Sequence, residues 1–245
     1  MNKIKPFSYD EYKYILDSIK DRLFNFRNIH SNKFILLRHD VEFNIFRAHE
    51  IAKIEFERNV SSTFFFQVRS PAYNPFSIDN KLLINKIKTY GHDIGLHFYV
   101  SNINADDKIS LINELRTQKE LFEKGLGLKC SIFSFHRPPE WVLKIRDNRI
   151  CEMINVYGDS FFEFSSSPKK IKYIADSMHK WNYGHPVDNL HYEKIQILLH
   201  PDEWSSEGST EKQLFHDLIE EQKKSFVNTL DNETKHFNKY KKDFQ

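Results

Sequence analysis

The sequence predicts an α/β fold, a complete or incomplete (β/α) barrel of about seven parallel strands with an extra helix at each end of the chain. Short apolar runs bounded by polar residues predict strands that are buried on both faces, as in parallel sheets. Stretches with helical periodicity separate these runs at intervals of roughly 30 residues, which is typical of repeated βα units. We expect one domain over residues 1–245, because the chain has no low-complexity linker.

The first half of the chain alternates regularly between the two patterns. Ser8 is the expected N-cap of a helix over residues 8–26, with Glu11 at the spacing of a capping box. The stretch FILLRHDVE, residues 34–42, predicts the first buried strand. The next elements expected are a helix over 44–58, a strand over 62–68, a helix over 77–90 and a strand over 93–100.

The second half is less regular. Residues 105–124 predict an amphipathic helix, and CSIFSF, residues 130–135, predicts a strand. Further strands are expected over 150–157, 170–177 and 194–201, of which the last has the clearest pattern. A charged helix over 209–240 ends the chain.

Composition excludes several classes of protein. A net charge of +2 gives no electrostatic basis for binding nucleic acid. The two cysteines, Cys130 and Cys151, cannot make a disulfide framework or a thiolate zinc site. No apolar run has the length of a membrane span, and the N-terminal lysines precede no apolar signal region, so we expect a cytoplasmic protein.

Polar and charged residues repeatedly end the predicted strands. If the strands are parallel, these ends meet on one face, where the active sites of α/β barrels lie. A single histidine at a strand end is more often a hydrogen-bonded structural residue, but a repeated pattern favours a site. Carboxylates and imidazoles together suit metal-assisted hydrolysis. The residues are Arg38, His39, Asp40 and Glu42 on the first strand, then His97, His136, Arg137, Asp176 and His200.

Five segments resemble motifs of the polysaccharide deacetylase superfamily of carbohydrate esterases, in its divergent Arg-His-Asp-Val-Asp/Glu branch. The resemblance covers about residues 34–204 and implies a distorted (β/α) barrel. The segments are RHDVE (38–42), GHDIGLH (91–97), FSFHRPP (133–139), YIADS (173–177) and LLHP (198–201).

The resemblance implies a role for each matched residue. Asp40 would be the catalytic base, and Arg137 would orient it. Glu42 and His97 would bind a divalent metal, zinc first, with nickel, cobalt or manganese as alternatives. His200 would be the general acid that also stabilises the oxyanion. Asp176 would orient His200 or bind substrate.

Two departures from the family pattern concern the metal. The family usually has a second metal-binding histidine four residues after the first, and Ser101 stands in that place. Glu42 replaces an aspartate and is longer. We therefore name His136 as the candidate for the missing third ligand.

The expected reaction is removal of an N-acetyl or other acyl group from an amino sugar or glycan intermediate of surface polysaccharide metabolism. Arg38, Trp141 and Trp181 are the candidates for binding this substrate. Two alternatives stay open: a sugar-binding barrel that lacks the usual metal triad, and a metal hydrolase that acts on a different C–N or ester bond.

Overall fold

The computed structural model describes residues 4–100, 103–104, 106–163 and 170–244. The chain forms two compact units, Met1–Gly208 and Ser209–Gln245. The second unit contains α6 (Glu211–Glu233), which lies within the charged helix expected over 209–240. The expectation of a single domain over 1–245 stays a prediction.

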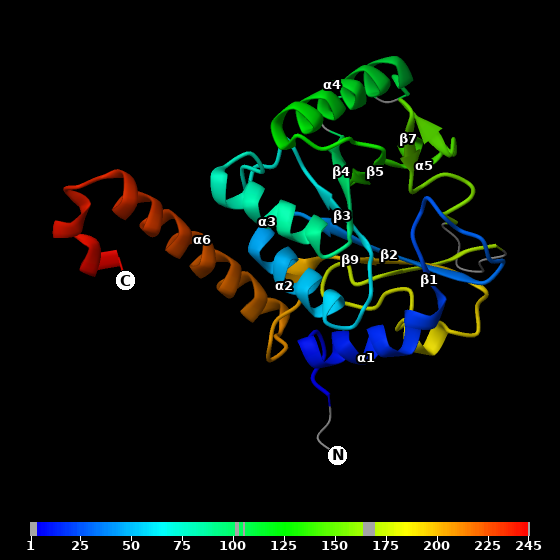
Figure 1. Ribbon diagram of the computed structural model, residues 1–245, viewed down its shortest axis with the longest axis horizontal. Coiled ribbons are helices and arrows are strands. Elements are labelled where there is room, and N and C mark those ends of the chain that lie inside the picture. The colour runs from blue at the N-terminus through cyan, green and yellow to red at the C-terminus, as the bar shows by residue number, and fades with distance from the viewer. Residues whose placement is uncertain (1–3, 101–102, 105, 164–169, 245) are drawn as a thin grey trace. The chain divides into compact units, whose positions relative to one another are not determined.

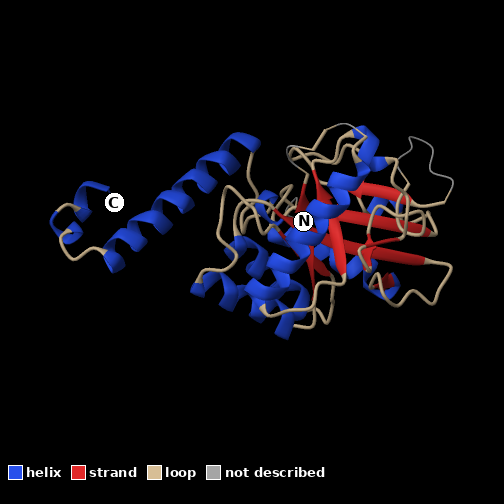
Figure 2. Ribbon diagram, turned by 90° about the horizontal axis from the view of Figure 1, so that it is seen from above, coloured by secondary structure: helices blue, strands red, loops and turns tan. Residues whose placement is uncertain are grey.

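The first unit is built on one curled, mostly parallel sheet with the strand order β6-β7-β5-β4-β3-β2-β9-β8, and β1 pairs with β2 outside this order. Every pair is parallel except β6 with β7. β6 and β8 are the two ends of the order, so the sheet forms an incomplete barrel, as the sequence predicts (Figure 2, strands in red). The strands are β1 (Leu23–Phe24), β2 (Phe34–Val41), β3 (Thr63–Phe66), β4 (Asp93–Tyr99), β5 (Ile132–His136), β6 (Arg149–Ile150), β7 (Met153–Asn155), β8 (Lys172–Ala175) and β9 (Lys194–Leu199).

Helices connect the successive strands on the outside of the sheet. Figure 1 shows three of them, α2, α3 and α4, each leading from one parallel strand to the next. Among the described residues, no helix combines the length and the apolar character needed to cross a membrane. The helices of this unit are α1 (Tyr9–Ile19), α2 (Ile45–Phe56), α3 (Ile78–Thr89), α4 (Lys108–Leu126) and the short α5 (Glu140–Leu143), with 3-10 turns at Lys20–Arg22, Val187–Asn189 and Pro201–Glu203.

Two expected elements differ from the structure. The helix expected over 8–26 starts from its Ser8 cap but ends at Ile19, because Leu23 and Phe24 pair with Ile35 and Leu36 of β2 instead. The single strand expected over 150–157 is a short antiparallel pair, β6 and β7. Cys151 and Glu152 turn the chain between them with φ values of 50° and 65°, which a continuous strand does not permit.

The central strand β2 is buried along its whole length, which explains its apolar run. Its side chains alternate between two faces, so Arg38 and Asp40 point one way and His39 points the other. His39 meets Glu55 of α2, with 2.7 Å between its Nε2 and Oε1 of the carboxylate. The sheet therefore separates a buried polar contact under α2 from the side chains at the end of the strand.

Candidate active site

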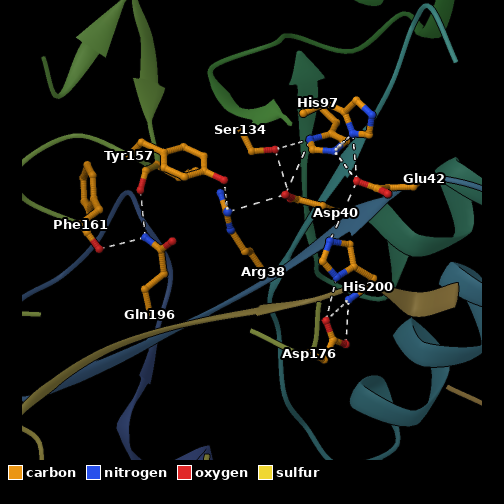
Figure 3. Close-up of polar contacts among 12 residues, drawn as sticks. Arg38, Asp40, Glu42, His97, Ser134, Tyr157, Phe161, Asp176, Gln196 and His200 are labelled. Atoms are coloured by element: carbon orange, nitrogen blue, oxygen red, sulfur yellow. Dashed lines mark hydrogen bonds and ion pairs between the residues drawn. The ribbon is translucent and has the colours of Figure 1, made fainter. Parts of the chain in front are cut away.

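The end of β2 presents three polar side chains in succession on one face. Arg38 and Asp40 are buried in the strand, and Glu42 follows its last residue (Figure 3). Asp202, from the turn after β9, holds this end in place. One of its carboxylate oxygens accepts from the backbone N–H of Glu42 at 3.3 Å and from that of Phe43 at 3.1 Å. The position of the Glu42 backbone is thus fixed by a buried carboxylate.

Glu42, His97 and His136 converge from three strand ends. His97 lies in β4, and His136 is the last residue of β5. His136 Nδ1 lies 2.9 Å from Glu42 Oε1 and 3.1 Å from His97 Nε2, while His97 Nε2 lies 3.5 Å from Glu42 Oε1. One ligand atom from each residue falls within 4.8 Å of the others, a grouping able to hold a metal ion.

A serine on β5 sets the orientation of His97. Ser134 Oγ lies 2.8 Å from His97 Nδ1 and 3.1 Å from Asp40 Oδ1. Because the Asp40 carboxylate can only accept, the Ser134 hydroxyl donates to it and accepts from the Nδ1–H of His97. This arrangement leaves the Nε2 lone pair of His97 directed toward Glu42 and His136, which is the tautomer that a metal ligand needs.

Glu42 stays charged in this setting. Burial raises its pKa, but the interactions with the His136 and His97 imidazoles and the charge of His200 outweigh that effect, so the pKa lies well below its usual range. One carboxylate and two imidazoles form a ligand set of the kind found around catalytic zinc. The residues present therefore fit a divalent metal, with His136 as the third ligand. Ser101 lies outside the described residues.

Asp40 is fixed through both of its oxygens. Oδ1 accepts from Ser134, and Oδ2 lies 3.6 Å from Nη2 of Arg38 and 3.7 Å from Nδ1 of His97. Arg137, which the resemblance assigns to this role, is exposed and follows β5 with a φ of 45°. In the part of the chain that the structure describes, no hydrogen bond or ion pair joins Arg137 to Asp40.

His200 faces the metal-ligand group from the other side of β2. Asp176, just past β8, accepts from the His200 backbone N–H and lies 2.7 Å from its Nδ1. Asp176 also accepts from the indole Nε1 of Trp204 at 2.9 Å. Figure 3 shows His200 between Asp176 and Glu42, with its Nε2 4.0 Å from Glu42 Oε1.

The charge of His200 follows from these neighbours. Burial lowers its pKa, but the charge and the hydrogen bond of Asp176, with the nearby Glu42 and Asp40, raise it to about 10. The imidazole is therefore protonated at neutral pH and able to donate a proton from Nε2. Since Asp176 is completely buried, its position suits orienting His200, one of the two roles expected for it.

Solved structures with a similar fold are named as carbohydrate esterases, whereas no family model and no curated protein matches the chain. A family 4 (CE4) pseudoenzyme from Bacillus anthracis is 16% identical, with a TM-score of 0.47, and the match covers 79% of this chain and 61% of that one. A family 4 acetyl xylan esterase from Clostridium thermocellum, in complex with a cobalt ion, is 16% identical, with a TM-score of 0.45 and coverage of 78% and 83%. A chitin deacetylase from the fungal pathogen Colletotrichum lindemuthianum is 14% identical, with a TM-score of 0.44 and coverage of 77% and 81%.

The chain thus spans less than two thirds of the length of the pseudoenzyme that it matches. At these identities the likeness concerns the fold, and the chemistry of this chain has to be found in its own residues.

The expected substrate-binding residues lie in different surroundings. Arg38 is completely buried, so its guanidinium is directed into the protein and not toward solvent. Trp141 is the second residue of α5 and lines an open cavity of about 630 Å3 together with Lys144 and Asp147. Trp181 packs against aromatic rings, among them that of Trp204 at 6.1 Å between centroids. Contact of any of the three with a substrate stays a prediction.

Two residues that contact the side chains of the candidate active site, Ser134 and Tyr157, were not predicted from the sequence. Ser134 lies two positions before His136 on β5, and strand alternation was the signal that places both on one face. Tyr157, whose hydroxyl accepts from Nη2 of Arg38 at 2.8 Å, lies in the loop after β7. No local pattern marks it, because its contact with Arg38 depends on how that loop returns over the sheet.

Proposed function

We propose that this protein is a divalent-metal-dependent hydrolase that removes an N-acetyl or other acyl group from an amino sugar or glycan intermediate. The observation that carries the proposal is the convergence of Glu42, His97 and His136 beside a fixed carboxylate, Asp40, and a protonated imidazole, His200. A metal site flanked by one proton acceptor and one proton donor suits hydrolysis of an amide or ester.

Glu42, His97 and His136 would hold the metal. When bound, a divalent ion supplies a Lewis acid that polarises the acyl carbonyl and makes water more acidic. Two ligands are ready for this role before an ion binds. Ser134 fixes the tautomer of His97, and Glu42 is already ionised at neutral pH, so it has no proton to lose.

Asp40 and His200 would move the protons. As water attacks the acyl carbon, a new C–O bond forms and Asp40 accepts the proton that the water loses. As the C–N bond breaks, protonated His200 gives its Nε2 proton to the leaving amine, and the free amino sugar results together with acetic acid, which then ionises to acetate. Before that step, the positive charge of His200 stabilises the negative oxygen of the tetrahedral intermediate.

The substrate class rests on the resemblance of the motifs to polysaccharide deacetylases. A surface-polysaccharide intermediate and a cytoplasmic location are parts of the same proposal. Zinc is the proposed ion, with nickel, cobalt and manganese as alternatives, since a carboxylate and two imidazoles accept all of them.

The test combines metal analysis with acetate release. The purified protein, metal-depleted and reloaded with zinc, is assayed on tetra-N-acetylchitotetraose and on acetylated xylan oligosaccharides. We expect release that chelation abolishes and that Asp40→Asn lowers by about 10²- to 10⁴-fold, the usual contribution of a general base. Asp188→Asn, at an exposed aspartate, is the control. Activity that survives both the chelator and Asp40→Asn would refute the proposal.

The second candidate is a barrel that binds sugar without a metal. It rests on Ser101, which stands where the family usually has its second histidine. Protein that binds these oligosaccharides, takes up no zinc, nickel, cobalt or manganese, and releases no acetate would favour this candidate. The position of His136 favours the first, because it would supply the third ligand from another strand.

A further inference from the structure

We infer that Arg38 is the positioning residue for Asp40, in the role that the resemblance gives to Arg137. The inference rests on the proposed function, in which Asp40 is the base. Under this inference, the residue that orients Asp40 lies two positions before it on the same strand, β2, and not in the loop after β5.

Arg38 carries a fully buried charge, and Asp40 is the carboxylate beside it. The side chain of Arg38 is 0% exposed and that of Asp40 is 2% exposed, with 3.6 Å between Nη2 and Oδ2. A buried charge is costly unless it is paired, so the two side chains hold each other in place. Burial lowers the pKa of Arg38. The negative charge of Asp40 raises it, and the pKa of Arg38 lies above its ordinary value.

Tyr157 contacts the same guanidinium nitrogen of Arg38 that faces Asp40. The Nη2 group donates to the Tyr157 hydroxyl at 2.8 Å, and the guanidinium carbon lies 4.6 Å from the centre of the tyrosine ring. Tyr157 is held in turn by Asn155, whose side-chain oxygen accepts from its backbone N–H at 3.0 Å. These contacts fix the position of the Arg38 side chain. A residue that orients Asp40 needs such a fixed position.

Strand geometry makes the pair rigid. Arg38 and Asp40 lie on the same face of β2, and both are in register with β3, opposite Thr63 and Phe65. Ser134 holds the other oxygen of the Asp40 carboxylate from β5, so one neighbour fixes Oδ1 and another fixes Oδ2. The plane of the carboxylate is thereby determined by groups on strands, which hold a geometry more accurately than loops do.

Arg137 is in a different situation. It directly follows the last residue of β5, and its left-handed φ of 45° turns the chain away from the strand direction. The side chain is exposed, while Arg38 already occupies the place beside Oδ2 of Asp40. To orient Asp40, the Arg137 side chain would have to occupy that place.

The test compares Arg38→Met, Arg38→Lys and Arg137→Met, with Arg116→Met on the exposed face of α4 as the control. In zinc-loaded protein we expect Arg38→Met to lower kcat by about 100-fold, the effect of a displacement near 1 Å at a reacting group. KM and zinc content should stay as in the wild type, since neither depends on Arg38. Arg38→Lys should recover part of kcat, and Arg137→Met should lower it far less than Arg38→Met.

Crystal structures of the same variants give a readout that does not depend on activity. We expect the Asp40 carboxylate to rotate out of its place in Arg38→Met and to keep it in Arg137→Met. An Asp40 that moves in Arg137→Met and stays in Arg38→Met would overturn the inference, whatever the enzyme does. If Arg38→Met does not fold, Arg38→Lys and Tyr157→Phe displace the same contacts more gently. Loss of the proposed function alone would appear as a wild type without acetate release but with an ordered Arg38–Asp40 pair.

Discussion

His136 is the residue on which the metal proposal depends most. Without its imidazole, Glu42 and His97 leave one carboxylate and one nitrogen, which is too few ligands for a stable zinc site. Loss of a group that only supports a ligand already costs about 10- to 100-fold in metal affinity. We therefore expect His136→Ala to weaken zinc binding by more than about 100-fold. Competition against a chromophoric chelator measures this directly.

The control for this substitution is His191→Ala, at an exposed histidine whose Nδ1 lies 3.2 Å from the backbone oxygen of Asp188. That variant should bind zinc as the wild type does. Equal zinc affinity in His136→Ala and in the wild type would show that another group supplies the third ligand. Thermal unfolding of the metal-free proteins separates a lost ligand from a lost fold.

At the scale of single residues, the sequence predicted which residue types meet at the strand ends, and their roles stay predictions. Asp40, Glu42, His97 and His200 come together because parallel strands end on one face. Arg137 lies beyond the end of β5, where its φ of 45° turns the chain, and strand periodicity does not predict that turn.

The packing of α2 against the sheet depends on a second buried polar group, which we call the Glu55 cluster: Tyr12, His39, Glu55, Ser62 and His92. His39 Nε2 lies 2.7 Å from the Glu55 carboxylate, Ser62 donates to it at 2.6 Å, and the Tyr12 hydroxyl donates as well. The cluster joins α1, α2, β2 and the residues before β3 and β4. It lies on the face of β2 opposite Asp40, so it supports the strand without taking part in the reaction.

Substitution of Glu55 should therefore act on stability. Removing one partner of a buried charge pair usually costs about 3–5 kcal/mol, and we expect Glu55→Gln to lower the free energy of unfolding by that amount at pH 7. Urea denaturation followed by circular dichroism measures the difference. Glu57→Gln, at an exposed glutamate just after the same helix, is the control and should change little.

The same substitution predicts a pH dependence with a definite sign. Burial raises the pKa of Glu55, but the charge and hydrogen bond of His39, with His92 and Ser62, hold it below the ordinary value of 4.5. A depressed folded pKa contributes stability that is fully present above the unfolded pKa and is lost as pH falls through the folded one. The gap between wild type and Glu55→Gln should thus shrink as the pH falls below about 4.5. A gap that widens below that pH would contradict this account of Glu55.

Element boundaries were the part of the fold that periodicity predicted least well. Apolar residues at 19 and 23–24 continue the helical pattern of α1, yet Leu23 and Phe24 join the sheet, because pairing with β2 satisfies their backbone groups and partly buries their side chains. In the same way, residues 150–157 have strand composition throughout, and only the left-handed pair at 151–152 divides them. The first difference arises from pairing with another strand, and the second from a tight local turn.

Across the whole molecule, alternation of strand and helix predicted the fold class, but not the order of the strands. The chain passes from β7, near one end of the sheet order, to β8, at the other end, before β9 enters between β8 and β2. This step brings His200 and Asp176 to the Asp40 side of the site. Sequence spacing carries no information about it, because the connecting segment has neither a helix nor a strand signal.

The division of the chain into two units leads to a prediction for the molecule as a whole. All residues of the hydrophobic core cluster among the described residues lie between Phe7 and Trp204, and every proposed catalytic and metal-binding residue lies before Gly208. We therefore expect a chain that ends at Gly208 to unfold in one cooperative transition and to bind zinc as tightly as the full chain. A chain that ends at Leu190 is the matched comparison. It lacks β9, which pairs with β2 on one side and β8 on the other, and should not fold. Calorimetry and zinc titration of the three proteins decide the matter: if the chain ending at Gly208 fails like the shorter one, residues 209–245 belong to the folding unit that carries the site.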